Sequence, residues 1–139
     1  MSKQTNQAMP SVSFSIRFLF ACCLLVATAN HVRADFQHGF LWDYGYGNGA
    51  YWASRVFWGA LTIVDPLAAL LLFIKPRVGI ALTAAIIIVD VVHNTFYVAL
   101  NRQWLEPFYL SQVAFLLAVL LLAPVAWHRT ARRDELGRY

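Results

Sequence analysis

Residues 78–100 read VGIALTAAIIIVDVVHNTFYVAL, and this stretch decides what kind of fold the chain forms. Apart from Asp90 and His93 it carries no acidic, basic or imidazole group. A helix needs about 20 apolar residues to cross a hydrocarbon layer of about 30 Å, and this run is long enough. Runs of similar character occupy residues 56–74 and 108–127. We therefore predict an all-α integral membrane protein, in which the short turn at residues 75–77 joins two antiparallel helices.

The composition supports this prediction and excludes several classes of protein. The chain has 139 residues and a mass of 15.7 kDa, with 60% hydrophobic and 13% charged residues and a mean hydropathy of +0.55. A soluble domain of this size needs more polar side chains to cover its surface. The net charge is +4, but the basic residues are spread thinly and do not alternate with aromatic ones. We therefore expect no nucleic-acid partner, and a single transmembrane helical domain over residues 1–139.

The first apolar run, residues 12–29, allows two interpretations. It is short, with Lys3 and Arg17 before its most apolar part and small residues near its end, as in a cleaved signal peptide within residues 1–34. It is also long enough for a membrane helix if the Arg17 side chain reaches the headgroups. The favoured prediction is a bundle of four transmembrane helices, and the alternative is a bundle of three.

Basic residues indicate how the helices are oriented. In a membrane they gather on the cytoplasmic side, which here would hold Lys3, Arg17, Lys75, Arg77, Arg129, Arg132, Arg133 and Arg138. Far fewer, Arg33, Arg55 and Arg102, would lie on the opposite side. This distribution predicts a cytoplasmic C-terminus with a basic tail at residues 128–139. A short chain with this bias is typical of a bacterial inner, or plasma, membrane.

Residues 35–52 contain many aromatic side chains interrupted by glycines. The glycines predict a loop, because a long helix would not tolerate so many of them. Tyrosine and tryptophan prefer the boundary between headgroups and lipid tails. We expect this segment to be a plug on the outer interface, and the alternative is a lid that covers a ligand cavity.

Polar side chains form one stripe on the helix expected at residues 78–100. Helical spacing places Asp90, His93, Asn94, Tyr97 and Asn101 on the same face. In the helix expected at residues 56–74, Asp65 lies at a similar depth, counting outward from the turn. Charged groups at the centre of a bilayer are costly, so both carboxyls need partners or a proton. We expect the two to face inward and to share one proton.

The sequence leaves three classes of function open. The first is a non-catalytic assembly or scaffold protein, whose polar stripe binds another membrane subunit or a second copy of the chain. The second is an intramembrane site for a small hydrophobic ligand, a cation or a proton, with Asp65, Asp90 and His93 as its main groups and Asn94 and Tyr97 beside them. The third is an acid–base enzyme acting on a lipid-like substrate, with catalytic residues that the sequence does not identify.

Motifs that would indicate a bound cofactor are missing from the sequence. It contains no phosphate-binding glycine loop, no HExxH and no pair of CxxC motifs. The only cysteines, Cys22 and Cys23, are neighbours within the first apolar run. We therefore expect neither a metal nor a cofactor, and no partner other than the lipid bilayer and membrane protein.

Overall fold

The computed structural model describes residues 12–45 and 47–136, and this part of the chain is helical except for its turns and one loop. Four of its helices are each long and apolar enough to cross a membrane, which confirms the predicted all-α architecture. The helices are α1 (Val12–His38), α2 (Trp52–Ile74), α3 (Pro76–Asn101) and α4 (Pro107–Leu136), with a single turn η1 (Gly47–Gly49) in the loop between α1 and α2.

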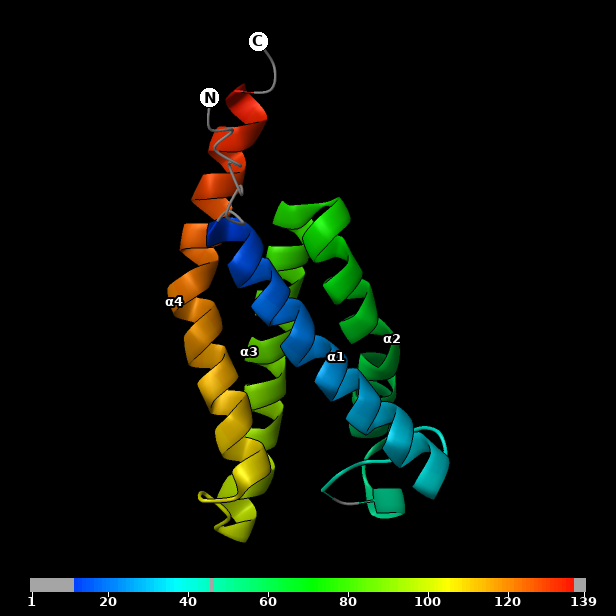
Figure 1. Ribbon diagram of the computed structural model, residues 1–139. Coiled ribbons are helices and arrows are strands. Elements are labelled where there is room, and N and C mark those ends of the chain that lie inside the picture. Colours follow the sequence, from blue (N-terminus) through cyan, green and yellow to red (C-terminus); the bar gives the residue numbers. More distant parts are fainter. Residues whose placement is uncertain (1–11, 46, 137–139) are drawn as a thin grey trace, which may run out of the picture.

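The helices run up and down in chain order (Figure 1). The start of α1, the turn between α2 and α3 and the end of α4 lie at one end of the bundle. The loop at residues 39–51 and the turn between α3 and α4 lie at the other end, which we call the loop end. This arrangement has the tight hairpin that the sequence predicted between α2 and α3.

All four helices extend beyond the predicted bounds, and the differences are largest at the ends of α1 and α4. The first was expected over residues 12–29, but α1 continues to His38 and ends at Gly39, which has a φ of +93°. The segment expected as the basic tail, residues 128–139, continues α4 as far as Leu136, and the last three residues lie outside the described part. Hydropathy marks where a helix stops being apolar, whereas a backbone stops being helical only where glycine, proline or a cap ends it. Residues 30–38 contain neither glycine nor proline.

The core lies where all four helices meet. Its buried members are mostly aliphatic or small: Ile16, Phe20, Ala21, Leu24, Ala68, Ala69, Leu72, Ile80, Ile87, Val119 and Ala126. The small residues let backbones approach closely. At Gly79 this approach is closest, because a Cβ atom there would lie 2.3 Å from the backbone nitrogen of Leu72. No side chain fits between α2 and α3 at this point.

Arg17 ties the first helix into the bundle. Its side chain is buried, and it donates to the carbonyl oxygen of Leu72 at 2.8 Å and to that of Ser13 at 3.2 Å. Ser13 in turn donates to the carbonyl oxygen of Ala126 in α4. The Arg17 side chain does not reach out toward lipid headgroups as its place in the sequence predicted. It instead binds a carbonyl in the last turn of α2, where helical carbonyls have no partner within their own helix.

Candidate functional site

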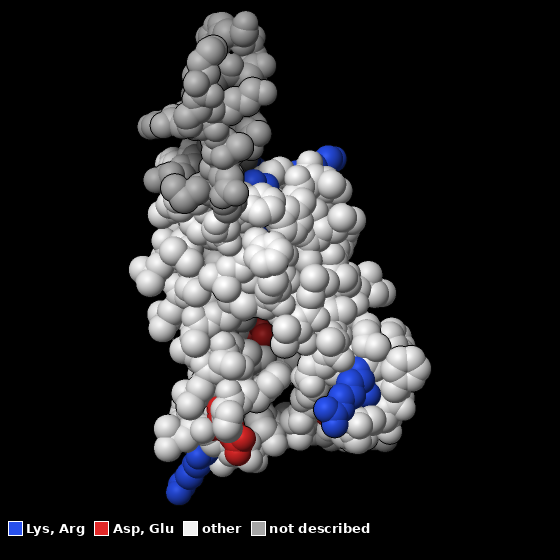
Figure 2. All heavy atoms as spheres, in the orientation of Figure 1, with Lys and Arg blue, Asp and Glu red and all other residues white. Residues whose placement is uncertain are grey.

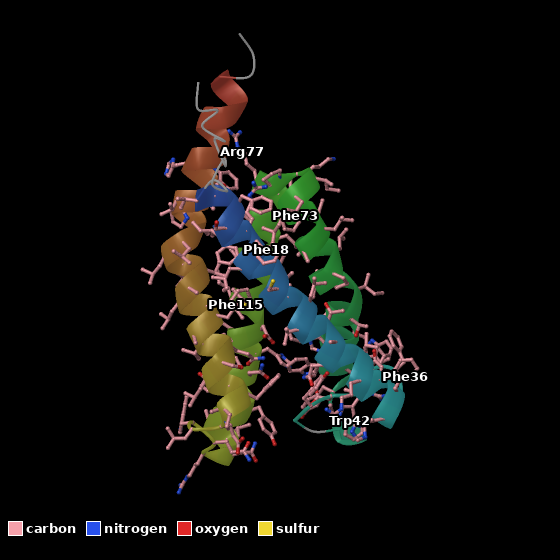
Figure 3. All side chains as sticks on the ribbon, in the orientation of Figure 1. Phe18, Phe36, Trp42, Phe73, Arg77 and Phe115 are labelled. Carbon is pink, nitrogen blue, oxygen red and sulfur yellow. The ribbon has the colours of Figure 1, made fainter. Side chains whose placement is uncertain are left out.

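A cavity of about 530 Å³ lies inside the bundle, on the side of the core nearer the loop end. α1 and α4 are in contact where the rings of Phe20 and Phe115 lie 6.0 Å apart, and Phe115, labelled in Figure 3, also lines the cavity. Further along, the two helices separate, and Figure 2 shows the resulting hollow with acidic atoms at its floor. Apolar side chains predominate in the lining, which comprises Cys22, Cys23, Leu24, Val26, Ala27, Asn30, His31, Leu61, Asp65, Ile86, Ile87, Asp90, Phe108, Ser111, Gln112 and Phe115.

Asp65 of α2 is the most deeply buried carboxyl group of the cavity, with 2% of the residue exposed. One carboxyl oxygen, Oδ2, lies 3.6 Å from Nε2 of His31 in α1. The other oxygen, Oδ1, is buried and has no hydrogen-bond partner among residues 12–45 and 47–136. A buried acceptor without a donor is costly, and such groups are rare in folded proteins. The lining of the cavity therefore includes a carboxyl group with one buried oxygen that no described residue satisfies.

Tyr44 holds His31 from the loop side. The Tyr44 hydroxyl lies 3.0 Å from Nδ1 of His31 and donates to the carbonyl oxygen of Asn30 at 3.2 Å. Its ring packs against Trp58 of α2 and is stacked on Phe108 of α4. Burial raises the pKa of the Tyr44 phenol above its ordinary value, so the group stays a neutral donor. Tyr44 thus fixes the imidazole and contacts two members of the lining, His31 and Phe108.

Asp90 of α3 is the second carboxyl group in the lining. It accepts a hydrogen bond of 3.2 Å from the amide nitrogen of Asn94, one turn further along α3. The same amide nitrogen donates to Oε1 of Gln112 in α4 at 2.7 Å. This pair joins α3 to α4 and orients Asp90 toward the cavity.

His93 does not line the cavity, although it shares the polar stripe with Asp90. Its Nε2 atom lies 2.9 Å from the hydroxyl of Ser54 in α2, and Ser54 donates to the Asp43 carboxylate in the loop. Because the serine proton goes to Asp43, Nε2 of His93 must be the donor to the serine oxygen. In a hydrolytic triad the serine would donate to the histidine, so this order of groups does not activate Ser54. We call Asp43, Ser54 and His93 the loop clasp.

The loop clasp is supported by close packing. Asp43 is 1% exposed and also accepts from the backbone N–H of Gly45 at 2.9 Å. A Cβ atom at Gly45 would lie 2.5 Å from the ring of Tyr97, so this backbone rests directly on the aromatic ring. Trp42 lies in the same loop, stacked on His38 at the end of α1 (Figure 3). The aromatic segment is therefore packed against the bundle.

The five candidate residues from the sequence fall into two groups. Asp65 and Asp90 line one cavity, with Asn94 bonded to Asp90. His93 and Tyr97 lie at the loop instead. The two carboxyls were expected to share a proton, but the group that the structure places against Asp65 is the imidazole of His31.

Sequence reasoning missed several residues around the cavity. His31 was overlooked because the first helix was expected to end at Ala29. A longer helix would have placed His31 on the stripe of Phe20 and Leu24, at helical spacing. Tyr44 and Ser54 carried no usable signal, because their role depends on how the loop folds back onto three helices.

The polar groups of this lining can accept hydrogen bonds or neutralise a cation. None of its described members is Lys or Arg, and it holds two carboxyl groups and one imidazole in apolar surroundings. Within the described part of the chain, no group of three or more His, Cys, Asp or Glu side chains is placed to hold a metal ion. Comparison with protein-family models, with curated proteins and with solved structures finds no match.

Proposed function

We propose that this chain is a multi-pass membrane protein whose bundle binds a small hydrophobic molecule bearing a protonated amine. Four apolar helices support a position in the bilayer. The face in Figure 2 also supports it, because its wide middle is uncharged outside the hollow and charged side chains lie toward its two ends. A lipid environment would cover the many exposed apolar side chains, such as Val26, Leu70 and Leu121.

The proposed orientation places the loop end outside the cell and the C-terminus in the cytoplasm of a bacterium. Lys75 and Arg77 stand at the end of the bundle that carries the end of α4. Arg33, Arg55 and Arg102 stand at or near helix ends on the loop side. Arg129, Arg132 and Arg133 belong to the last turns of α4, and the cytoplasmic side of a membrane protein carries the excess of Lys and Arg.

The observation that carries the proposal is that Asp65 lines an apolar cavity with a carboxyl group whose Oδ1 atom has no hydrogen-bond partner among the described residues. An ammonium group offers three N–H donors and a positive charge, and it is the natural partner of a buried carboxylate. The apolar walls account for the hydrophobic part of the ligand. Cavities of about 300–1,000 Å³ with a few polar groups in apolar walls are typical of small-molecule sites, and this one falls in that range.

The distance of Asp65 from both ends of α2 limits the size and type of amine that can reach it. Asp65 lies 13 residues after Trp52 and nine before Ile74, the two ends of α2. At 1.5 Å per residue these separations are about 20 Å and about 14 Å. An amine in a lipid headgroup, held at the membrane surface, does not reach such a depth. A compact apolar amine does, and the opening between α1 and α4 gives it a route from the hydrocarbon layer.

The two cysteines allow a direct test. Cys22 and Cys23 both line the cavity and are the only thiols of the chain. In a Cys22→Ala variant, N-ethylmaleimide would report occupancy through Cys23. We expect 1-aminoadamantane, a compact cage with an ammonium group, to slow the labelling of Cys23. The neutral analogue of the same shape, 1-adamantanol, should protect about 10- to 100-fold less effectively, since a hydrogen bond to a charged group contributes about 1.5–3 kcal/mol.

Matched variants distinguish binding at Asp65 from nonspecific partitioning of the amine into the bilayer. Asp65→Asn should remove the preference for the amine over the alcohol. Asp35→Asn makes the same chemical change outside the cavity, where Asp35 accepts from Thr62, and should leave that preference intact. Equal protection by both compounds in the unmodified site would contradict the proposal. Loss of a native oligomer in Asp65→Asn, with no ligand effect in any variant, would favour the assembly function that the sequence predicted first.

A further inference from the structure

The hydrogen bonds around His31 determine which of its nitrogens carries a proton. Tyr44 has one hydroxyl proton, which it donates to the carbonyl oxygen of Asn30. The proton between Tyr44 and Nδ1 of His31 must therefore come from Nδ1. A neutral His31 then presents the lone pair of Nε2 toward Asp65, and a charged His31 presents an N–H.

With this tautomer, the charge of the His31–Asp65 pair depends on whether the pair holds one further proton. With a neutral imidazole and an ionised carboxyl, the lone pair of Nε2 would face a carboxylate oxygen at 3.6 Å, and the pair would carry an uncompensated negative charge. Both residues are buried, His31 at 5% and Asp65 at 2% exposure. Isolated buried charge is strongly disfavoured. Without a bound cation, His31 and Asp65 therefore hold one further proton, on the imidazole or on the carboxyl, and are neutral together.

We propose that binding of an organic ammonium at Asp65 displaces this proton into bulk water, so that the chain couples cation binding to proton release. The inference rests on the proposed function and specifies its chemistry. The ammonium donates to Oδ1 of Asp65 and supplies the positive charge that the proton supplied before. Its remaining donors can reach Nε2 of His31, which becomes an acceptor on losing the proton. One cation enters, one proton leaves to the buffer, and the charge of the cavity is unchanged.

Other ionisable groups face the pair from the elements packed around it. Asp90 of α3 lines the same cavity, and the thiols of Cys22 and Cys23 belong to α1 itself. The loop contributes the Tyr44 phenol, and Asp35 lies one turn further along α1. The polar side chains that α4 adds to the lining do not ionise; they are Ser111 and Gln112. The described lining thus contains no cationic side chain that could take the place of the displaced proton.

Calorimetric titration with 1-aminoadamantane measures the coupling. Near pH 7 an alkyl amine is already protonated, so a released proton comes from the protein. In two buffers with different enthalpies of ionisation, the difference in binding enthalpy gives the number of protons released. We expect about one proton per ligand bound, and an affinity that rises about tenfold per pH unit while the pair of the free protein stays protonated. For 1-adamantanol both effects should be absent.

The outcomes distinguish this inference from the proposed function. If 1-aminoadamantane fails to protect Cys23, the binding function itself is wrong. If it protects Cys23 but releases no proton and binds equally well across pH, binding stands and the coupling is overturned. Asp65→Asn should bind more weakly and release no proton, whereas Glu106→Gln, the same kind of change in the exposed turn between α3 and α4, should behave as the parent chain. Undiminished release in Asp65→Asn would assign the proton to another group and overturn the role of this pair.

Discussion

Replacing Asp43 by alanine should open the loop at residues 39–51 without unfolding the bundle. The Asp43 side chain is almost completely buried and accepts hydrogen bonds from the Gly45 backbone and the Ser54 hydroxyl. Alanine would remove the carboxylate acceptor of both groups in a place that water reaches poorly. The four helices make their core contacts elsewhere, around Phe20, Leu24 and Leu72.

The size of the effect follows from the two lost partners. Each buried donor left unpaired costs about 1–3 kcal/mol, so the pair costs about 2 kcal/mol at the lower limit. Since about 1.4 kcal/mol is a factor of ten, the open state of the loop should become about 30-fold more populated. Hydrogen–deuterium exchange of peptides that cover residues 43–51 measures this population. The N–H of Gly47, bonded to the Asp43 carbonyl, and the N–H of Gly45 should both exchange faster.

Two comparisons make this prediction refutable. Asp43→Asn keeps an acceptor oxygen for the Gly45 N–H, so its exchange should fall between those of the parent chain and Asp43→Ala. Peptides from the middle of α3 should be unchanged in both variants. Equal exchange of the loop in all three proteins would show that the loop clasp contributes nothing to loop closure. Faster exchange throughout the chain would show that Asp43 supports the whole fold, which also contradicts the reasoning.

Three further predictions concern stability and the first helix. Gly79→Ala should lower the thermal midpoint strongly, because the new Cβ would meet the Leu72 backbone, whereas Gly49→Ala, with no atom within 4 Å, should not. Stability should fall as pH rises above about 10, since the unfolded Tyr44 phenol ionises there while burial raises its folded pKa; Tyr44→Phe should lessen this fall in thermal unfolding scans. Intact mass spectrometry of the purified chain should find residues 12–38 retained, because Arg17 binds α2 inside the bundle; a mass without them would contradict this packing.

The number and type of the helices could be predicted from the sequence, because both depend on local properties. Apolar runs of sufficient length and the short turn at residues 75–77 are visible without any tertiary information. The inward face of α3 was also predictable, since the spacing of Asp90 and Asn94 follows the helical period. Helix ends were less accurate, because polar residues such as those at 30–38 end an apolar run but do not end a helix.

The cavity and its partners were decided by tertiary structure. Asp90 and His93 share one helical stripe, yet α3 turns Asp90 into the cavity and His93 toward Ser54 of α2. His31 meets Asp65 only because α1 continues past the expected end and crosses α2 there. The periodicity of a helix determines which residues lie on one face. The packing of neighbouring helices and the folding of a loop determine which partner each of those residues meets, and that information is distributed over the whole chain.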